Sequence, residues 1–272
     1  MRGASRTALA VAVARFDEVA RGLDGGALAR LSDELFSVLH VVDTEHILRR
    51  SLSDPSRPGS AKTEVAQVLF SGKISAEALD VVGTVVGQRW SRPSEMADGI
   101  ENLAVIAEIS RAEALGSLDD LEDELFRFGR IVEGEPDLRN ALVDSSVGPD
   151  RKAELATALL GGRATDSTIR LVRQVVRHSR GRSPERSIAQ LGKAVSDRRR
   201  RLVAIVRSAV PLEPAEKDRL GRALAGIYGH AVQVKAEVDP SVLGGMSVQV
   251  GDEVVDGTIA GRLDRLKRRF ER

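Results

Sequence analysis

The sequence has no cysteine, one tryptophan and one tyrosine, and aromatic residues make up only 3% of its 272 residues. The missing cysteine excludes disulfides, thiol chemistry and thiolate metal sites. So few aromatic rings leave no platform of the usual kind on which nucleic-acid bases stack. None of the four histidines has another three or four positions away, so the sequence shows no histidine pair on one helix face.

The sequence also lacks a large net charge and a long apolar run. Basic and acidic residues number 41 and 40, which does not favour a globally basic nucleic-acid binder. A membrane-spanning helix needs about 20 consecutive apolar residues, and no segment supplies them. The run from Ala8 to Ala14 is similar to a short signal-peptide core, but its apolar stripe continues past Asp17 and Glu18. We therefore expect an amphipathic helix there.

No residue pattern predicts a catalytic centre. Carboxylates cluster around Asp33, Asp43 and 119–124, and on helices this charged we expect them to form a solvated face. Four histidines are candidate bases outside any Ser/His/Asp pattern: His40, His46, His178 and His230. Two glycine pairs, at 25–26 and 161–162, lack the Lys-Ser/Thr of a phosphate loop and are expected to form turns or helix ends. We expect a protein without enzyme activity, cofactor or metal.

Apolar residues recur at helical spacing through the first two thirds of the chain. Prolines at 55, 58 and 93 interrupt the pattern, because a proline stops a helix and biases the preceding residue to an extended backbone. Between these interruptions the spacing predicts helices at 5–21, 27–42, 61–69, 76–90 and 95–114.

The pattern then recurs 90 residues further on. Glu34-Leu35-Phe36 returns as Glu124-Leu125-Phe126, and Gly72 returns as Gly162. Helix cores, loop positions and helix ends match together without a gap up to Arg92 and Arg182. Such agreement predicts a duplicated helical unit, and two copies are too few for a solenoid. We expect two stacked helical bundles.

After residue 201 the spacing changes to period two, which is typical of strands. A β-branched run at 202–206 predicts a strand, and 215–228 predicts a helix with Leu220, Leu224 and Ile227 facing inward. Three further short strands are predicted at 232–238, 246–250 and 254–255. A closing helix carries one apolar stripe, formed by Ile259, Leu263, Leu266 and Phe270.

These patterns predict a mostly α fold with a small C-terminal α+β module. Two related helical bundles come first, followed by a small mixed sheet with helices. We expect three domains: an extra helical unit at 1–99, a second helical bundle at 100–196, and the α+β module at 197–272.

Four consecutive arginines support an alternative function. Arg198 to Arg201, with further arginines between 170 and 182, are a candidate phosphate-binding patch. A helical adaptor or RNA-binding regulator is therefore the second hypothesis, although the scarce aromatics and the balancing acidic residues argue against it.

The C-terminal segment also carries an ordered set of short motifs. Four follow one another between residues 237 and 263: Glu237-Val238-Asp239-Pro240, Leu243-Gly244-Gly245, Asp256-Gly257-Thr258 and Gly261-Arg262-Leu263. In order and spacing this set resembles the signature of the delta subunit of F-type ATP synthases, the OSCP family. The additional helical unit resembles the actinobacterial form, in which that region is duplicated.

The resemblance implies a non-catalytic peripheral-stalk subunit of a proton-translocating ATP synthase. Its helical region would grip the N-terminal segments of the alpha subunits, and its C-terminal module would bind the b-subunit stalk. It would lie at the cytoplasmic face of the cell membrane, held there by the complex and without inserting into the bilayer. Seven residues form the implied structural signature: Asp239, Pro240, Gly244, Gly245, Asp256, Gly257 and Thr258. Six residues of the closing helix are the candidate partner interface: Ile259, Arg262, Leu263, Leu266, Arg269 and Phe270.

Overall fold

The computed structural model describes residues 3–201, 203–228, 232–240, 242, 244–250 and 253–257. The chain forms two compact units, Met1–Val195 and Ser196–Arg272. The predicted C-terminal helix and its six interface residues, together with Thr258, lie outside the described residues.

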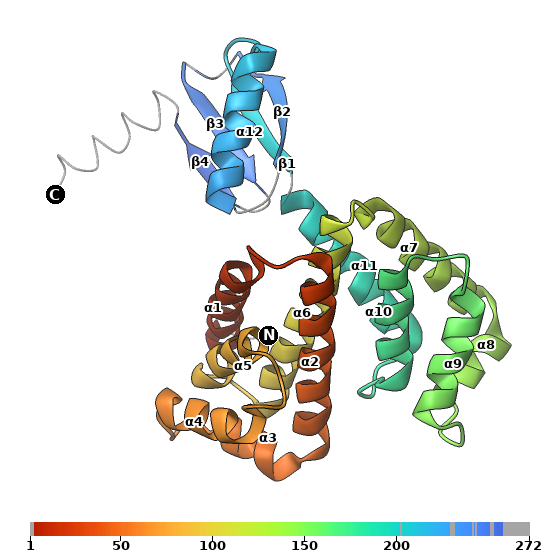
Figure 1. Ribbon diagram of the computed structural model, residues 1–272. Helices are drawn as coiled ribbons and strands as arrows, with labels where there is room; N and C mark the ends of the chain where they lie inside the picture. Colours follow the sequence, from red (N-terminus) through yellow and green to blue (C-terminus); the bar gives the residue numbers. More distant parts are fainter. Residues whose placement is uncertain are drawn as a thin grey trace. The chain divides into compact units, whose positions relative to one another are not determined.

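In its described residues the first unit consists of helices joined by short loops (Figure 1). The helices α1 to α6 are Gly3–Ala20, Gly25–Thr44, His46–Ser53, Gly59–Phe70, Ala76–Gly87 and Pro93–Ala114. The helices α7 to α11 are Leu118–Gly134, Pro136–Val143, Pro149–Leu160, Asp166–Arg177 and Pro184–Arg201, and the last of these extends past the unit's boundary. The short helices α3 and α8 were not predicted from the sequence.

The duplication reappears in the geometry. The helices α3, α4 and α5 begin and end 90 residues before α8, α9 and α10. Each copy of the turn after α4 or α9 contains a glycine in the left-handed region, Gly72 at φ 74° and Gly162 at φ 69°. Asp54 and Asp144 accept backbone N–H bonds from Ser56 at 2.9 Å and Ser146 at 2.8 Å. Helix ends and turn chemistry thus repeat along with the apolar pattern.

The helix α6 belongs to both copies. It begins 90 residues after α1, so it is the first helix of the second copy, and α11 follows it at nearly the same offset. It also packs against α1, α2 and α5, as the last helix of the first copy. The boundary predicted between residues 99 and 100 therefore falls inside one continuous helix.

Hydroxyl and carboxylate side chains cap the N-termini of several of these helices. Asp24 accepts the backbone N–H of Ala27 at 2.8 Å, and Ser75 accepts that of Ala78 at 3.2 Å. The cap of α5 is tied to α2, because Ser75 also donates to Glu34. Its counterpart Thr165 donates in the same way to Glu124 at 2.8 Å. Each copy thus repeats a link between its second and fifth helices.

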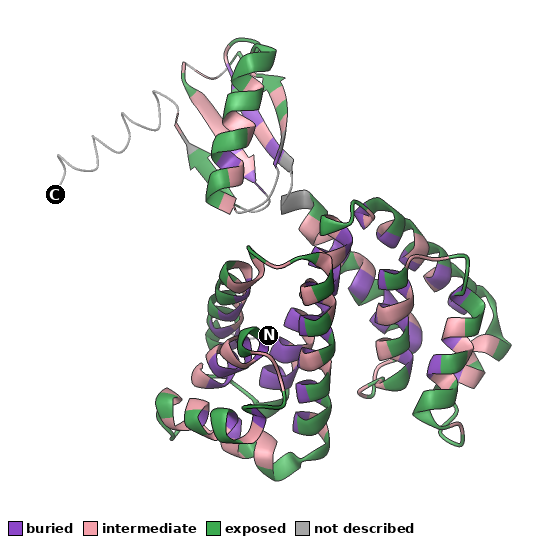
Figure 2. Cartoon of the chain, viewed as in Figure 1, coloured by how far each residue is buried: buried purple, intermediate pink, exposed green. Residues whose placement is uncertain are grey.

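Buried positions line the facing sides of the helices, whereas the outer sides are exposed (Figure 2). The first copy is filled by large side chains with under 2% exposure, among them Phe16, Leu35, Leu52 and Leu103. The second copy has the same kind of interior, with Leu121, Leu125 and Leu171. Apolar burial at this density is the main stabilising contribution to such a unit.

The second unit is a small α+β module. It contains β1 (Val203–Ser208), α12 (Pro214–Tyr228), β2 (Gln233–Val238), β3 (Met246–Val250) and β4 (Glu253–Asp256). The described strands form one mixed sheet in the order β2-β1-β3-β4, in which β1 and β2 are parallel and the other pairs antiparallel. The parallel pair is joined through α12, as a parallel connection requires. The fold class predicted from the sequence is confirmed.

The helix α12 covers one face of the sheet. Leu224 is buried against Val206 and Val248, and Leu220 packs against the same cluster. The prediction that Ile227 faces inward is wrong, because its side chain is 70% exposed. Tyr228 takes that place, packing against the core while its hydroxyl donates to Glu253 at 3.0 Å.

Candidate interaction surfaces

A seam of ion pairs joins the two helical copies. Arg170, on α10, donates from Nε to Glu108 of α6 at 2.9 Å. Its Nη2 donates to Asp33 of α2 at 2.8 Å and to the carbonyl oxygen of Ala29 at 2.9 Å. Glu108 is fully buried and also accepts from Arg111 at 2.9 Å. One guanidinium thus ties α10 of the second copy to α2 of the first copy and to the shared helix α6.

Arg180, three residues after the end of α10, belongs to the same seam. It is the one non-glycine residue at positive φ, 51°, among the described residues. Its guanidinium pairs with Asp43 of α2 at 2.6 Å and with Asp98 of α6 at 3.0 Å, and it also contacts Glu101. Arg182 pairs with the same Glu101. A residue that tolerates this backbone poorly is therefore held in place by carboxylates of the first copy.

The first copy has a different residue at the position of Arg180. Trp90 is 3% exposed there, and its Nε1 donates to the carbonyl oxygen of Val85 at 2.8 Å. The ring lies so close to Gly99 that a Cβ on that glycine would come within 2.5 Å of the ring carbon Cη2. The tryptophan thus closes the interior of its own copy, whereas the arginine reaches into the other.

One further equivalent position has exchanged charge. In the first copy Asp80 of α5 pairs with Arg15 of α1 at 2.5 Å. In the second copy the position of Asp80 holds Arg170, and its partner is Glu108 of α6. Both copies therefore join their first and fifth helices by an ion pair of opposite polarity. The second pair is the better shielded, since Glu108 has a side-chain exposure of 1% and Asp80 one of 39%.

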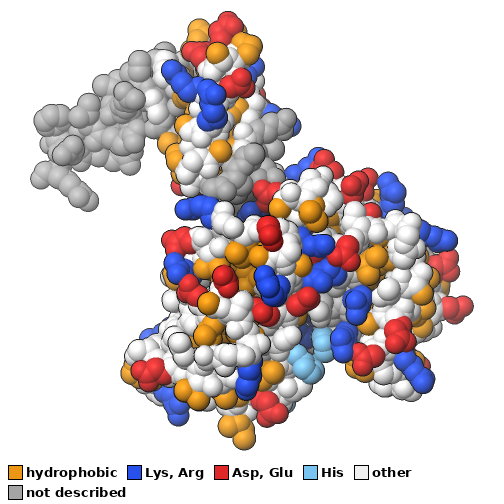
Figure 3. Space-filling model, viewed as in Figure 1, with side chains coloured by type: hydrophobic (Ala, Val, Ile, Leu, Met, Phe, Trp, Pro, Cys, Tyr) orange, Lys and Arg blue, Asp and Glu red, His pale blue; other side chains and the backbone are white. Residues whose placement is uncertain are grey.

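Two of the four histidines meet at the seam. The rings of His40, on α2, and His178, just after α10, lie 4.8 Å apart, and histidine side chains lie together on the surface in Figure 3. Burial lowers the pKa of His178, and the neighbouring His40 and Arg177 lower it further. His46 contacts Arg49 through Nδ1 at 3.0 Å, and His230 lies outside the described residues.

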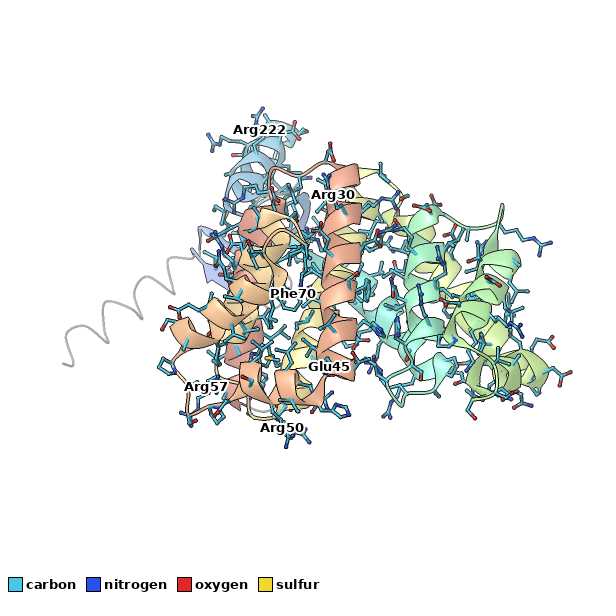
Figure 4. All side chains as sticks on the ribbon, turned by 60° about the horizontal axis from the view of Figure 1, so that its bottom comes forward. Arg30, Glu45, Arg50, Arg57, Phe70 and Arg222 are labelled. Atoms are coloured by element: carbon cyan, nitrogen blue, oxygen red, sulfur yellow. The ribbon has the colours of Figure 1, made fainter. Side chains whose placement is uncertain are left out.

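The helix α2 forms the first copy's side of the seam. Figure 4 shows it in front, from Arg30 near its beginning to Glu45 just after its end. A buried hydroxyl fixes it to α6, because Ser32 donates to the carbonyl oxygen of Ala104 at 3.0 Å. None of these seam contacts was predicted from the sequence. The arginines of α10 were predicted only as a candidate phosphate patch.

The described signature residues lie between β2 and β3 and at the end of β4. The N–H of Asp239 donates to the carbonyl oxygen of Ser208 at 2.9 Å, which extends the β1–β2 pairing by one bond. Pro240 follows it in a turn. Gly244 and Gly245 have φ 99° and 80°, conformations that favour glycine. Asp256 pairs with Ser247, and the N–H of Gly257 donates to the carbonyl oxygen of Met246 at 3.0 Å. These positions shape the backbone between and beside the strands.

No ligand chemistry gathers in the described part of the chain. It contains no group of three or more histidine or carboxylate side chains placed to hold a metal ion. A shallow groove between α4 and α5 is lined by Gly59, Thr63, Gly83, Gly87 and Asp80, among others, and Asp80 already pairs with Arg15. No helix among these residues is both long and apolar enough to cross a bilayer.

The arginines near the predicted phosphate patch are largely engaged within the protein. Arg170, Arg180 and Arg182 form the seam, and Arg177 pairs with Asp150 at 2.6 Å. Arg198 and Arg199 also have interactions within the chain. A phosphate would have to compete with these carboxylates, which weakens the RNA-binding hypothesis.

Comparison with known proteins decides between the two hypotheses. The model of the family described as "ATP synthase delta (OSCP) subunit" matches residues 105–270. The chain belongs to the ATP synthase delta (OSCP) subunit family. It is 48% identical to ATP synthase subunit delta of Streptomyces avermitilis, over 98% of both chains. It is 41% identical to the same subunit of Thermobifida fusca, over 99% of both chains. A chain of the Toxoplasma gondii mitochondrial ATP synthase hexamer matches at TM-score 0.33 and 16% identity, covering 62% of this chain and 95% of that one.

The family model begins inside α6, so the first copy lies outside it. The Streptomyces and Thermobifida delta subunits match along nearly their whole length, so they too include the first copy. The protein is therefore an ATP synthase delta subunit of the longer form, and the resemblance predicted from the C-terminal motifs is confirmed.

Proposed function

We propose that this delta subunit is a stator: it links the alpha–beta head of a proton-translocating ATP synthase to the b-subunit stalk and resists the torque of the rotor. The observation that carries the proposal is the full-length similarity to ATP synthase delta subunits, 48% over 98% of both chains in one case. We infer that the chain takes no part in catalysis itself.

The two units suit two separate attachments. The helical unit offers long helices and a buried ion-pair seam, which favour a stiff body that transmits force without bending. We propose that this helical unit binds the N-terminal segments of the alpha subunits. The α+β unit carries the family signature around β3, and we assign it the end of the b stalk. We also retain the division of the helical unit into 1–99 and 100–196 as a proposal about its evolutionary origin.

The attachments imply a place in the cell. We propose that the protein lies at the cytoplasmic face of the cell membrane and is held there only through the synthase. The proposed contact with the stalk is made by six residues: Ile259, Arg262, Leu263, Leu266, Arg269 and Phe270.

Co-purification tests this assignment. We expect the tagged full-length chain to bring alpha, beta and b subunits from solubilised membranes. The double variant R262E/R269E should keep alpha and beta but lose b, because it reverses charge on the proposed stalk contact. Arg222→Glu, at an exposed position of α12 in the same unit, is the matched control and should retain all three. Recovery of b with R262E/R269E at the wild-type level would contradict the assignment of the stalk to this helix.

A further inference from the structure

The seam lies on one face of α2, and α7 carries an equivalent face 90 residues later. The α2 face consists of five residues at helical spacing: Ala29, Asp33, Phe36, His40 and Asp43. Its two carboxylates bind Arg170 and Arg180 of the second copy, at 2.8 and 2.6 Å. Phe36, between them, is partly buried against the core of the first copy. The face thus combines two arginine-binding carboxylates with a phenyl ring midway.

The helix α7 keeps the three residues that define this arrangement. Positions 33, 36 and 43 correspond to Asp123, Phe126 and Glu133, which we call the α7 face. Its carboxylates are ten residues apart, as on α2, which is about 15 Å along a helix axis. No third copy follows to cover it, because the chain continues from α11 into the α+β unit. The α7 face is therefore one half of a seam whose other half this chain does not supply.

The α7 face is open to solvent. Phe126 is 69% exposed, and the outer side of α7 is exposed around it (Figure 2). Asp123 pairs with Arg127 of the same helix at 3.3 Å. Glu133 pairs with Arg130, also of α7, at 3.3 Å. All four charged side chains are more than half exposed, and such pairs contribute little free energy. An arginine from a partner can therefore replace the local one at small cost.

The spacing and the charges define the chemistry of the partner. It is a helix lying along α7, with two arginines about 15 Å apart and an apolar side chain between them to cover Phe126. A second copy of this chain does not supply these arginines from its own seam, because Arg170 and Arg180 already bind the first copy. Of the proposed partners the b stalk is favoured, since α11 of this copy leads directly into the unit that carries the proposed stalk contact.

We propose that the α7 face is a second docking site for the b stalk and binds an arginine-bearing helical segment of it. This inference rests on the proposed stator function and adds a contact on the helical unit to the one at the C-terminal end. A stalk held at one short segment turns about that contact, whereas a second contact opposes the turning. Two linked contacts also bind more tightly than either one alone.

Photo-crosslinking in the assembled synthase identifies the neighbour of the α7 face. With p-benzoylphenylalanine in place of Phe126, irradiation should join the chain to b. The same photoreactive residue in place of Val68, which is 83% exposed on α4 of the first copy, should give no product with b. A product with alpha or beta in place of b, or no product in an assembled synthase, would overturn the proposal.

Charge reversal measures the contribution of the two carboxylates. The double variant D123R/E133R should raise the dissociation constant of the full-length chain for the purified soluble part of b about threefold to tenfold, and high salt should reduce the difference. E64R/E154R is the matched control, because it reverses two exposed helix positions, one in each copy, and it should bind like the wild type.

The outcomes separate the second docking site from the stator function. Wild-type affinity of D123R/E133R for b would overturn the second site while leaving the C-terminal contact in place. Failure of the wild-type chain itself to bind b would instead overturn the stator function. If D123R/E133R does not fold, the crosslink at position 126 decides, since it leaves both carboxylates intact.

Discussion

Single positions show how the two copies came to differ. Trp90 and Arg180 are equivalent in the repeat, yet one packs on its own copy and the other bridges to its neighbour. A tryptophan there completes an isolated core. An arginine there makes the second copy depend on carboxylates of α2 and α6. The exchange of one residue thus explains why the copies form one unit.

We predict that Arg180→Met destabilises the helical unit by about 2–4 kcal/mol, because it leaves Asp43 and Glu101 partly buried with fewer cationic partners. Arg127→Ala breaks an ion pair whose side chains are more than 70% exposed, and it should cost less than about 1 kcal/mol. Urea unfolding of both variants would show the difference. Equal costs would mean that the seam contributes no more than a surface pair.

Two glycine-to-alanine substitutions should have opposite effects on the free energy of unfolding. Gly99→Ala should destabilise by about 1–3 kcal/mol, because the added methyl group meets the Trp90 ring. Gly192→Ala, on α11, meets no atom within 4 Å and should stabilise by up to about 1 kcal/mol through helix propensity. Thermal unfolding monitored by circular dichroism distinguishes them. A stabilising Gly99→Ala would contradict the close packing of Trp90.

The seam should weaken in acid. The folded state lowers the pKa of His178 below its ordinary 6.5, so the unfolded chain takes up this proton first as the pH falls. Stability is therefore full above 6.5 and declines as the pH drops through it, with His40, Arg177, Asp43 and Asp150 as the charged neighbours. His178→Gln should show a smaller fall in melting temperature between pH 7.5 and 5.5. The control is His46→Gln, at an exposed position, whose melting temperature should fall as much as that of the wild type.

At the scale of elements, α6 makes the two copies one cooperative body. Leu35→Ala and Leu171→Ala, one in each copy, should each cost about 2–5 kcal/mol and lower the same unfolding transition. Leu224→Ala, under the sheet of the second unit, should leave that transition in place. Calorimetry of the three variants provides the measurement. Separate transitions for the first two variants would show that the copies unfold independently.

The sequence predicted the long elements well, because their signals are local. The alternation of 246–250 predicted β3 at its observed bounds, and proline and glycine marked the ends of α4. The helices α3 and α8 were missed, since eight residues span too few turns to show a stripe. Ile227 was wrongly placed because Tyr228, one position on, covers the sheet with its ring and keeps its hydroxyl at the edge.

Contacts between the copies could not be predicted in the same way. Arg170 and Asp33 are 137 residues apart, and nothing in the sequence around either indicates the other. The repeat aligned α1 with α6, but it gave no sign that one helix completes both copies. The signature turns were predictable, because positive φ at Gly244 and Gly245 leaves few other residues possible there.

For the whole molecule, the proposed function is that of a mechanical link. A stator must bind at both ends at once, so losing either attachment should uncouple proton movement from ATP turnover while the head still hydrolyses ATP. The helical unit and the α+β unit would each be necessary, and neither would suffice alone.

ATP-driven proton pumping by inverted membrane vesicles is the decisive measurement of this mechanical link. Vesicles stripped of the chain should hydrolyse ATP without acidifying their interior. Adding back the full-length chain should restore acidification, and adding R262E/R269E should not. Acidification that persists without the chain, or that the wild-type chain does not restore, would contradict the stator function.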